Sequence, residues 1–216
     1  MKKLAAWRLW LESCALGTVL VSGGAHAALP EKVIVTDDDV RRFDADTPFN
    51  FSEGALNVQT SFSTSRDMVL DDWAVVRVAP QVLFELNGTL SSPTVFGSPL
   101  EKLGAGTLRL AGRNTYSSLT ALREGTLILA GDTPLGSAMP VLEQGTGTVL
   151  ELELGARVAN PIELWEAWPE DQPLPGREGL VEWRVRDGVA FMDGQIGTQD
   201  IPVRKTGAGV LQLNQV

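Results

Sequence analysis

Short runs in which apolar and polar residues alternate recur along the chain. The clearest are Val82–Leu86, Leu108–Leu110, Leu127–Leu129, Leu150–Leu154 and Val210–Leu213. Alternation with a period of two puts every second side chain on one face, so each run predicts a β-strand with one buried face. Turn-forming Gly, Asn, Asp and Pro residues separate the runs. No amphipathic helix is predicted beyond the N-terminal segment, and the expected fold class is all-β.

The spacing of these runs favours a coil over a sandwich. Leu127 follows Leu108 by 19 residues, and Leu150 follows Leu127 by 23 residues. Antiparallel sandwiches space their strands by roughly 8–12 residues, whereas a β-helix lays each strand parallel on its predecessor after one longer turn. The intervening segments Leu119–Leu122 and Pro140–Leu142 are expected to supply the other faces of each turn.

An internal repeat supports the coil. The segment Lys102–Leu110 returns as Lys205–Leu213, at an offset of 103 residues. The preceding segments Asn87–Leu90 and Asp193–Ile196 correspond at an offset of 106 residues. Such small differences in offset are typical of loop insertions in a solenoid. We interpret the second copy as a repeat that starts at residue 205 and is cut off at Val216.

The best repeat, residues 102–136, resembles the autotransporter-associated β-strand repeat. The matching positions are Lys102, Gly104, Gly106, Thr107, Leu108, Leu110, Gly112, Asn114, Thr115, Tyr116, Thr120, Gly125, Thr126, Leu127 and Leu129. Ser118 and Leu119 depart from the family pattern, which affects a turn rather than the strands. Residues 149–164 resemble the continuation of the family more weakly.

This resemblance implies a right-handed parallel β-helix, the passenger of a protein secreted by the type V route. Such a passenger leaves the cell through an outer-membrane β-barrel of many ~10-residue amphipathic strands. No such region is recognisable in this sequence, so the barrel translocator is expected but absent from this chain. The expected organisation is a signal peptide at 1–27, an N-terminal region of uncertain structure at 28–75, and β-helix repeats at 76–216.

The first residues have the features of a secretory signal. Lys2, Lys3 and Arg8 precede an apolar stretch, and Ala25-His26-Ala27 forms a cleavage site. Cleavage after Ala27 would remove the only Cys and the only His of the chain. The mature protein would then lack a thiol nucleophile, a histidine base, a disulfide and a Cys/His zinc site.

Composition excludes some partners. The chain has 216 residues, 44% hydrophobic residues and a formal net charge of −9. This hydrophobic content is that of a globular protein, and the acidic charge argues against nucleic acid as a partner. We expect an unknown host or cell-surface ligand, and export through the periplasm of a Gram-negative bacterium to the cell surface or medium.

Candidate sites have structural alternatives that we prefer. Residues 104–106 lack the further glycines and the lysine of a phosphate loop, and predict a tight turn. The acidic group at 37–46 lacks the Gly and Glu of an EF-hand, and predicts a solvated segment rather than a calcium site. Glu151 and Glu153 share one face of one strand, which predicts solvent-facing carboxylates rather than the opposed pair of a glycosidase.

Two further segments are also interpreted structurally. Residues 165–176 contain three prolines in the stretch 169–175, so they predict a protruding loop. Its Trp165 and Trp168 are expected to pack back on the coil rather than to contact a partner. Residues 112–116 predict a structural turn around Asn114. We therefore predict no catalytic, cofactor-binding or metal-binding residue, and no cofactor.

The expected function is a non-catalytic β-helical stem with an adhesion or display role. Two alternatives stay open at this point. One is a truncated, non-functional autotransporter product, and the other is a β-helix enzyme that acts on polysaccharides. An acidic patch across adjacent turns of the coil would favour the enzyme, and none is evident in the sequence.

Overall fold

A computed structural model describes residues 31–32, 49–51, 54–71, 73–93, 99–131, 135–136, 141–168 and 171–214. The predicted signal peptide, at residues 1–27, and the acidic group at 37–46 lie outside these residues. Every regular element of the described part is a β-strand. Within that part, no helix is long and apolar enough to cross a membrane.

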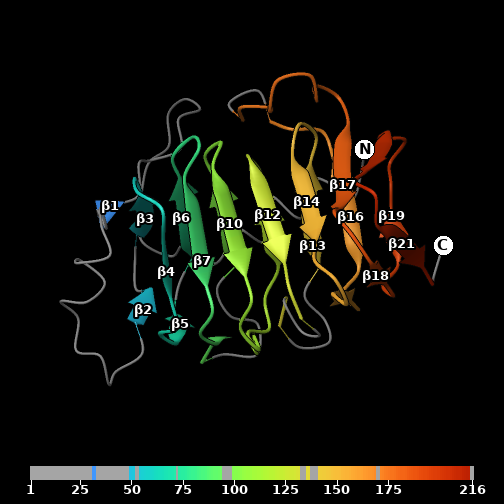
Figure 1. Ribbon diagram of the computed structural model, residues 1–216. Coiled ribbons are helices and arrows are strands. Elements are labelled where there is room, and N and C mark those ends of the chain that lie inside the picture. Colours follow the sequence, from blue (N-terminus) through green and yellow to red (C-terminus); the bar gives the residue numbers. More distant parts are fainter. Residues whose placement is uncertain are drawn as a thin grey trace, which may run out of the picture.

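The described strands form four parallel sheets that run along the faces of one coil (Figure 1). The eight-stranded sheet contains β1 (Glu31–Lys32), β3 (Gly54–Val58), β6 (Ala74–Val78), β9 (Leu100–Leu103), β11 (Thr120–Leu122), β13 (Leu142–Gly145), β16 (Ile162–Trp165) and β19 (Ile196–Gly197). The seven-stranded sheet contains β4 (Phe62–Thr64), β7 (Leu83–Leu86), β10 (Thr107–Leu110), β12 (Thr126–Leu129), β14 (Val149–Leu152), β17 (Val181–Val185) and β20 (Val203–Thr206). The third face carries two short sheets, one of β2 (Phe49–Phe51), β5 (Met68–Leu70) and β8 (Leu90–Ser91), the other of β15 (Arg157–Val158), β18 (Val189–Met192) and β21 (Val210–Leu213).

A turn of the coil takes its strands from successive faces in chain order, and the rungs β9–β10 and β11–β12 have described strands only in the two large sheets. Strands β3, β4 and β5 make one such rung, and β6, β7 and β8 make the next. The rungs then continue as β9–β10, β11–β12, β13–β15, β16–β18 and β19–β21. The strands stack as a β-solenoid of about six turns, which confirms the all-β coil predicted from the spacing.

The interior of the coil is built from columns of apolar side chains in exact register from rung to rung. In the seven-stranded sheet, Phe84, Leu108, Leu127, Leu150 and Trp183 occupy one such column. All five belong to the buried core. Burying one such side chain contributes about 1.5–3 kcal/mol, so a column that crosses five strands holds the rungs together without a disulfide.

Residues 104–106 form the corner between β9 and β10, which confirms the predicted turn. Gly104 has a φ of 77°, and a Cβ atom there would lie 2.3 Å from the carbonyl oxygen of Val78 on the previous rung. Only glycine tolerates both the left-handed conformation and so close an approach of two backbones. The glycines of the repeat therefore set the distance between successive rungs at this corner.

The two copies of the internal repeat occupy different corners of the coil. Lys102 lies in β9 of the eight-stranded sheet, whereas Lys205 lies in β20 of the seven-stranded sheet. The first copy thus turns from β9 into β10, and the second turns from β20 into β21 on the third face. The 103-residue offset is therefore not a whole number of turns, because the second copy enters the coil one face later.

Candidate functional site

A long insertion marks one corner of the coil. The corner between β16 and β17 spans residues 166–180, whereas the equivalent corners at 104–106, 123–125 and 146–148 have three residues each. We call residues 166–180 the strap; residues 169–170 are not among those described. In Figure 1 the strap arches in orange over the corner that joins the two large sheets.

The strap lies against earlier corners rather than extending into solvent. Its Leu174 N–H donates to the carbonyl of Gly147 at 2.9 Å, and the Gly147 N–H donates to the carbonyl of Leu180 at 2.7 Å. The Gln172 N–H donates to Glu124 Oε1 at 3.0 Å, two rungs away from the strap's own. The prediction of a loop is correct, and much of it is exposed as it arches over the coil, while these backbone groups hold it to earlier corners.

A buried ion-pair network fixes the strap. Arg123 Nη2 lies 2.8 Å from Asp171 Oδ1, and Arg123 Nη1 lies 2.7 Å from Glu101 Oε1. Trp73 Nε1 donates to the second oxygen of Glu101 at 3.1 Å. Burial raises the pKa of Asp171, and the hydrogen bond from Arg123 opposes that rise. The guanidinium of Arg123 therefore joins carboxylates from two separate rungs.

Two tryptophans pack on the same arginine, which agrees with the prediction that the tryptophans pack back on the coil, although the arginine itself was not predicted. Arg123 Cζ lies 3.8 Å from the ring centroid of Trp168 and 5.8 Å from that of Trp165. The two indoles meet edge to face with centroids 5.5 Å apart. Trp168 keeps 40% of its surface exposed. This arrangement combines a cation–π contact with the ion pair, and it leaves one aromatic surface open at the corner.

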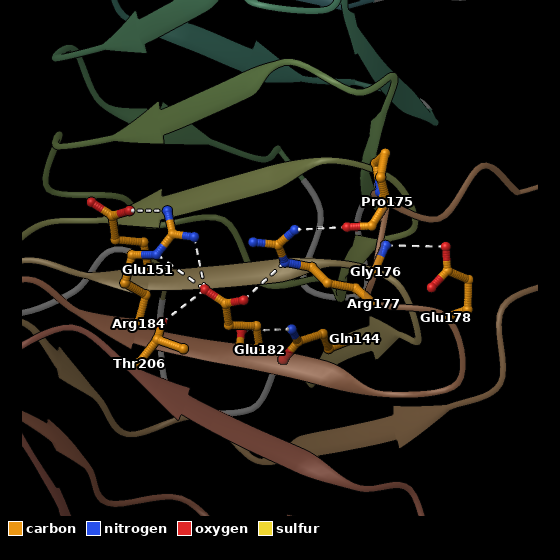
Figure 2. A network of polar contacts seen from close by, with 9 residues as sticks. All are labelled: Gln144, Glu151, Pro175, Gly176, Arg177, Glu178, Glu182, Arg184 and Thr206. Atoms are coloured by element: carbon orange, nitrogen blue, oxygen red, sulfur yellow. Dashed lines mark hydrogen bonds and ion pairs between the residues drawn. The ribbon is translucent and has the colours of Figure 1, made fainter.

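A second network covers the outer face of the seven-stranded sheet, and Figure 2 shows its central part. The buried carboxylate of Glu182 accepts hydrogen bonds from Arg177 Nε at 2.8 Å, Arg184 Nη2 at 2.7 Å and Thr206 Oγ1 at 2.7 Å. Arg177 belongs to the strap, while Arg184 and Thr206 lie on β17 and β20. This network ties the strap to the rungs that follow it.

The prediction of solvent-facing carboxylates on β14 is wrong for Glu151. Its side chain points outward, yet Glu151 is only 2% exposed because Arg184 Nη1 and Arg186 Nε cover its two oxygens at 3.3 and 2.5 Å. Glu153 is more open, and Arg109 binds both of its oxygens at 2.7 and 2.8 Å. Arginines from rungs distant in the sequence neutralise both carboxylates, so the pair resembles no catalytic dyad.

Sequence reasoning missed a different pair of carboxylates. Glu143 on β13 and Glu163 on β16 lie directly opposite each other in the parallel register. Burial, followed by the charge of Glu163, raises the pKa of Glu143 to about 7. The spacing of 20 residues equals one turn of the coil and could have indicated the pair, but the register of these rungs was not evident from the sequence.

The characteristic residues of the repeat serve the coil itself. Lys102 points inward, and its Nζ donates to the carbonyls of Leu103, Gly104 and Glu124 at 2.9, 2.7 and 3.0 Å. Burial lowers the pKa of Lys102 to about 7. Asn114 Oδ1 accepts the N–H of Leu90 on the previous rung at 2.8 Å, which agrees with a structural turn.

The tyrosine of the repeat is also part of the interior. The Tyr116 hydroxyl lies 2.6 Å from Thr120 Oγ1 inside the coil, and burial raises its pKa. Within the part of the chain that the structure describes, no group of three His, Cys, Asp or Glu side chains is placed to hold a metal ion.

Comparison with known proteins adds one decisive match. Residues 100–129, which run from β9 through β12, match the family model described as the passenger-associated-transport-repeat. This match and the parallel coil fit an autotransporter passenger repeat region. No curated protein and no solved structure matches the chain. The matched segment includes Lys102, Asn114 and Tyr116, so it contains residues that bond one rung to the next.

Proposed function

We propose that this chain is a non-catalytic stem that is exported from a Gram-negative cell and projects binding surfaces from it. The observation that carries this proposal is the repeat at residues 100–129, which forms part of one continuous parallel coil. The polar groups found on the outer faces are largely engaged with one another, as Glu151, Glu153 and Glu182 are with arginines. Such pairing suits a scaffold better than a reactive surface.

Export is tested by following the protein in its native host. We expect the N-terminal sequence of the exported form to begin at Ala28, after removal of residues 1–27. Protease added to intact cells should then digest the protein, while a periplasmic marker stays intact. A cellular protein that keeps Met1 and resists external protease would contradict the proposal.

Adhesion is tested separately with the purified protein. The exposed ring of Trp168 at the strap corner is the surface that we expect to contribute to binding of a host or cell surface. Trp168→Ala should weaken binding to cultured cells, whereas Glu178→Gln, at a fully exposed position of the same strap, should not. Equal binding by the two variants would show that Trp168 does not contribute to binding.

A second candidate function, action on polysaccharides, is favoured by Glu143 and Glu163. Neighbouring strands lie about 4.8 Å apart, so the two carboxyl groups can come close enough for the charge of Glu163 to raise the pKa of Glu143. A carboxyl group with a pKa of about 7 can stay protonated and act as a general acid. Glu143 and Glu163 lie on adjacent rungs of the eight-stranded sheet, whereas Glu151 and Glu153 belong to the same rung.

Polysaccharide screening distinguishes the two candidates. If the chain is only a stem, neither neutral nor acidic polysaccharides should be cleaved at any pH between 5 and 8. Turnover that disappears in both Glu143→Gln and Glu163→Gln, and persists in Glu178→Gln, would establish the enzyme instead.

A further inference from the structure

Contacts between rungs that are not adjacent set this coil apart from a simple solenoid. In solenoids each repeat contacts only its neighbours, so stability is approximately a sum of terms for repeats and their nearest interfaces. Here Asp171, in the β16–β18 rung, pairs with Arg123, which lies two rungs earlier at the end of β11. Arg123 in turn pairs with Glu101 on β9, three rungs before the strap.

A second connection runs beside the first. The strap N–H of Gln172 donates to Glu124 Oε1, and Glu124 Oε2 accepts the N–H of Gly104 at 2.6 Å. Glu124 thus joins the strap to the β9–β10 corner through a single side chain. Both oxygens of Glu124 accept backbone N–H groups, so this connection fixes the main chain of the strap relative to the main chain of the corner.

A third connection lies on the outer face of the seven-stranded sheet. Arg109 on β10 binds Glu153, which follows β14, and therefore passes over the intervening strand β12. Ile128 and Ala130 occupy the outer positions that it crosses, and neither carries a charge that could compete for the guanidinium. The same group of rungs is thus tied at its corner and on one face.

We propose that the strap is a clamp that makes the four rungs from β9 to β18 open as one cooperative unit. The side chains of Glu101, Arg123 and Asp171 are 8%, 7% and 3% exposed, so solvent hardly screens the pairs between them. Removing one partner of a buried ion pair leaves a charge without compensation, which destabilises every element that holds it. Opening of the strap therefore loosens β9, although about 70 residues separate the two along the chain.

Native-state hydrogen exchange on the full chain tests this clamp. Mass spectrometry follows amides of β9 and of β17 as denaturant increases, with β6 outside the clamp as reference. In the unmodified protein, β9 and β17 should converge on one common opening reaction. In Asp171→Asn, exchange of β9 should rise by roughly tenfold and should separate from that of β6.

Two further variants make the result decisive. Glu178→Gln is the matched control, because Glu178 lies on the strap but bonds only to the backbone within it. Its exchange should equal that of the unmodified protein. Replacement of residues 166–180 by Gly-Ala-Gly copies the short corner at 104–106 and leaves Arg123 paired with Glu101, so it removes the clamp without leaving Arg123 unpaired.

The shortened chain should therefore also exchange faster in β9 and show separate openings of β9 and β17. Unchanged β9 exchange in the shortened chain would overturn the proposal. So would an effect of Glu178→Gln as large as that of Asp171→Asn, because a general loosening of the strap would then explain both.

Discussion

Lys102 shows how a single polar side chain can belong to the core of a coil. Its ammonium lies among three backbone carbonyls at a corner, two from its own turn and one from the next rung. The Glu124 carbonyl is buried and the other two are partly buried, so Nζ supplies a donor at a corner that water hardly reaches. Lys205 makes the same kind of contact with Gly207 and Gly209 in the second copy, but its side chain is exposed.

Lys102→Met should therefore lower the free energy of unfolding by about 2–4 kcal/mol, because buried acceptors lose a charged donor. Lys205→Met is the matched control and should cost less than about 1 kcal/mol, since water can replace the exposed ammonium. Urea denaturation of both variants measures the difference. Equal losses in the free energy of unfolding would show that burial does not increase the contribution of Lys102 to stability.

Glu143 is the residue whose charge opposes the fold. Its pKa in the folded chain is about 7, against an ordinary value of 4.5. The cause is burial first and then Glu163 opposite it, with Arg123 opposing and Glu101 adding to the rise. A raised carboxyl pKa contributes stability that is complete at acid pH and is lost as the pH rises through 7.

Glu143→Gln should therefore leave stability unchanged near pH 4.5 and raise it by about 1–3 kcal/mol at pH 8, the upper value being the full conversion of the pKa rise. Glu153→Gln provides a control of opposite sign, because the hydrogen bond from Arg109 lowers the pKa of Glu153. That variant should lose stability at pH 8 and approach the unmodified protein in acid. Thermal unfolding of the three proteins at pH 4.5 and 8 measures these effects. A stabilising effect of Glu143→Gln that is equal at both pH values would rule out the charge explanation.

At the scale of the elements, the corners decide how closely two rungs approach. Gly104 and Gly131 both have positive φ, at 77° and 86°. A Cβ atom at Gly104 would meet the Val78 carbonyl, whereas one at Gly131 has no atom within 4 Å. The two glycines thus share the left-handed conformation that would strain any other residue, and they differ in how closely another backbone approaches.

Substituting each glycine in turn separates the cost of the left-handed conformation from the cost of the close backbone contact. Gly131→Ala should cost about 1 kcal/mol through the left-handed conformation alone. Gly104→Ala should cost about 2–3 kcal/mol more, because the rungs must move apart to admit the methyl group. Chemical denaturation of the two variants is the measurement, and equal costs would mean that the corner has room to relax.

At the scale of the whole molecule, the last described rung leaves one side of its strands open. Strands β19, β20 and β21 each pair with an earlier rung on one side, and no described strand pairs with the other. Leu213 continues the column of Met192 and is 39% exposed. Unpaired edges with apolar side chains are templates for pairing with another chain.

We therefore expect a polypeptide that stops at this rung to self-associate as its concentration rises. Leu213→Lys places a charge in the open column and should reduce the association. Val189→Lys is the control, because Val189 is 36% exposed but lies on β18, which is paired on both sides. Sedimentation velocity compares the three proteins, and an unmodified protein that stays monomeric throughout the concentration series would refute the role of this edge.

The sequence by itself determined several of the strands, the glycine corner at 104–106 and the coil, whereas residues 28–75 gave no prediction of the strands that the structure places there. Alternating apolar residues place Leu108, Leu127 and Leu150 on one inner face, and the period of about 20 residues brings them into one column. The alternation is local and the spacing is periodic, so both can be recognised in the sequence without knowing which outer side chains contact one another. The family resemblance rests on the same local pattern, since the repeat residues bond within a rung or to the next one.

The tertiary structure alone decided which charges meet. Arg123 and Asp171 are 48 residues apart, and Arg109 and Glu153 are 44 apart. Both separations are about two turns of the coil, so the repeat spacing shows which rungs are involved but not which outer side chains meet. Their meeting depends on the insertion that returns the strap over earlier corners and on the register that stacks Glu143 against Glu163. An outward position on a strand thus indicates which way a side chain points, whereas its burial depends on the partners that the fold brings to it.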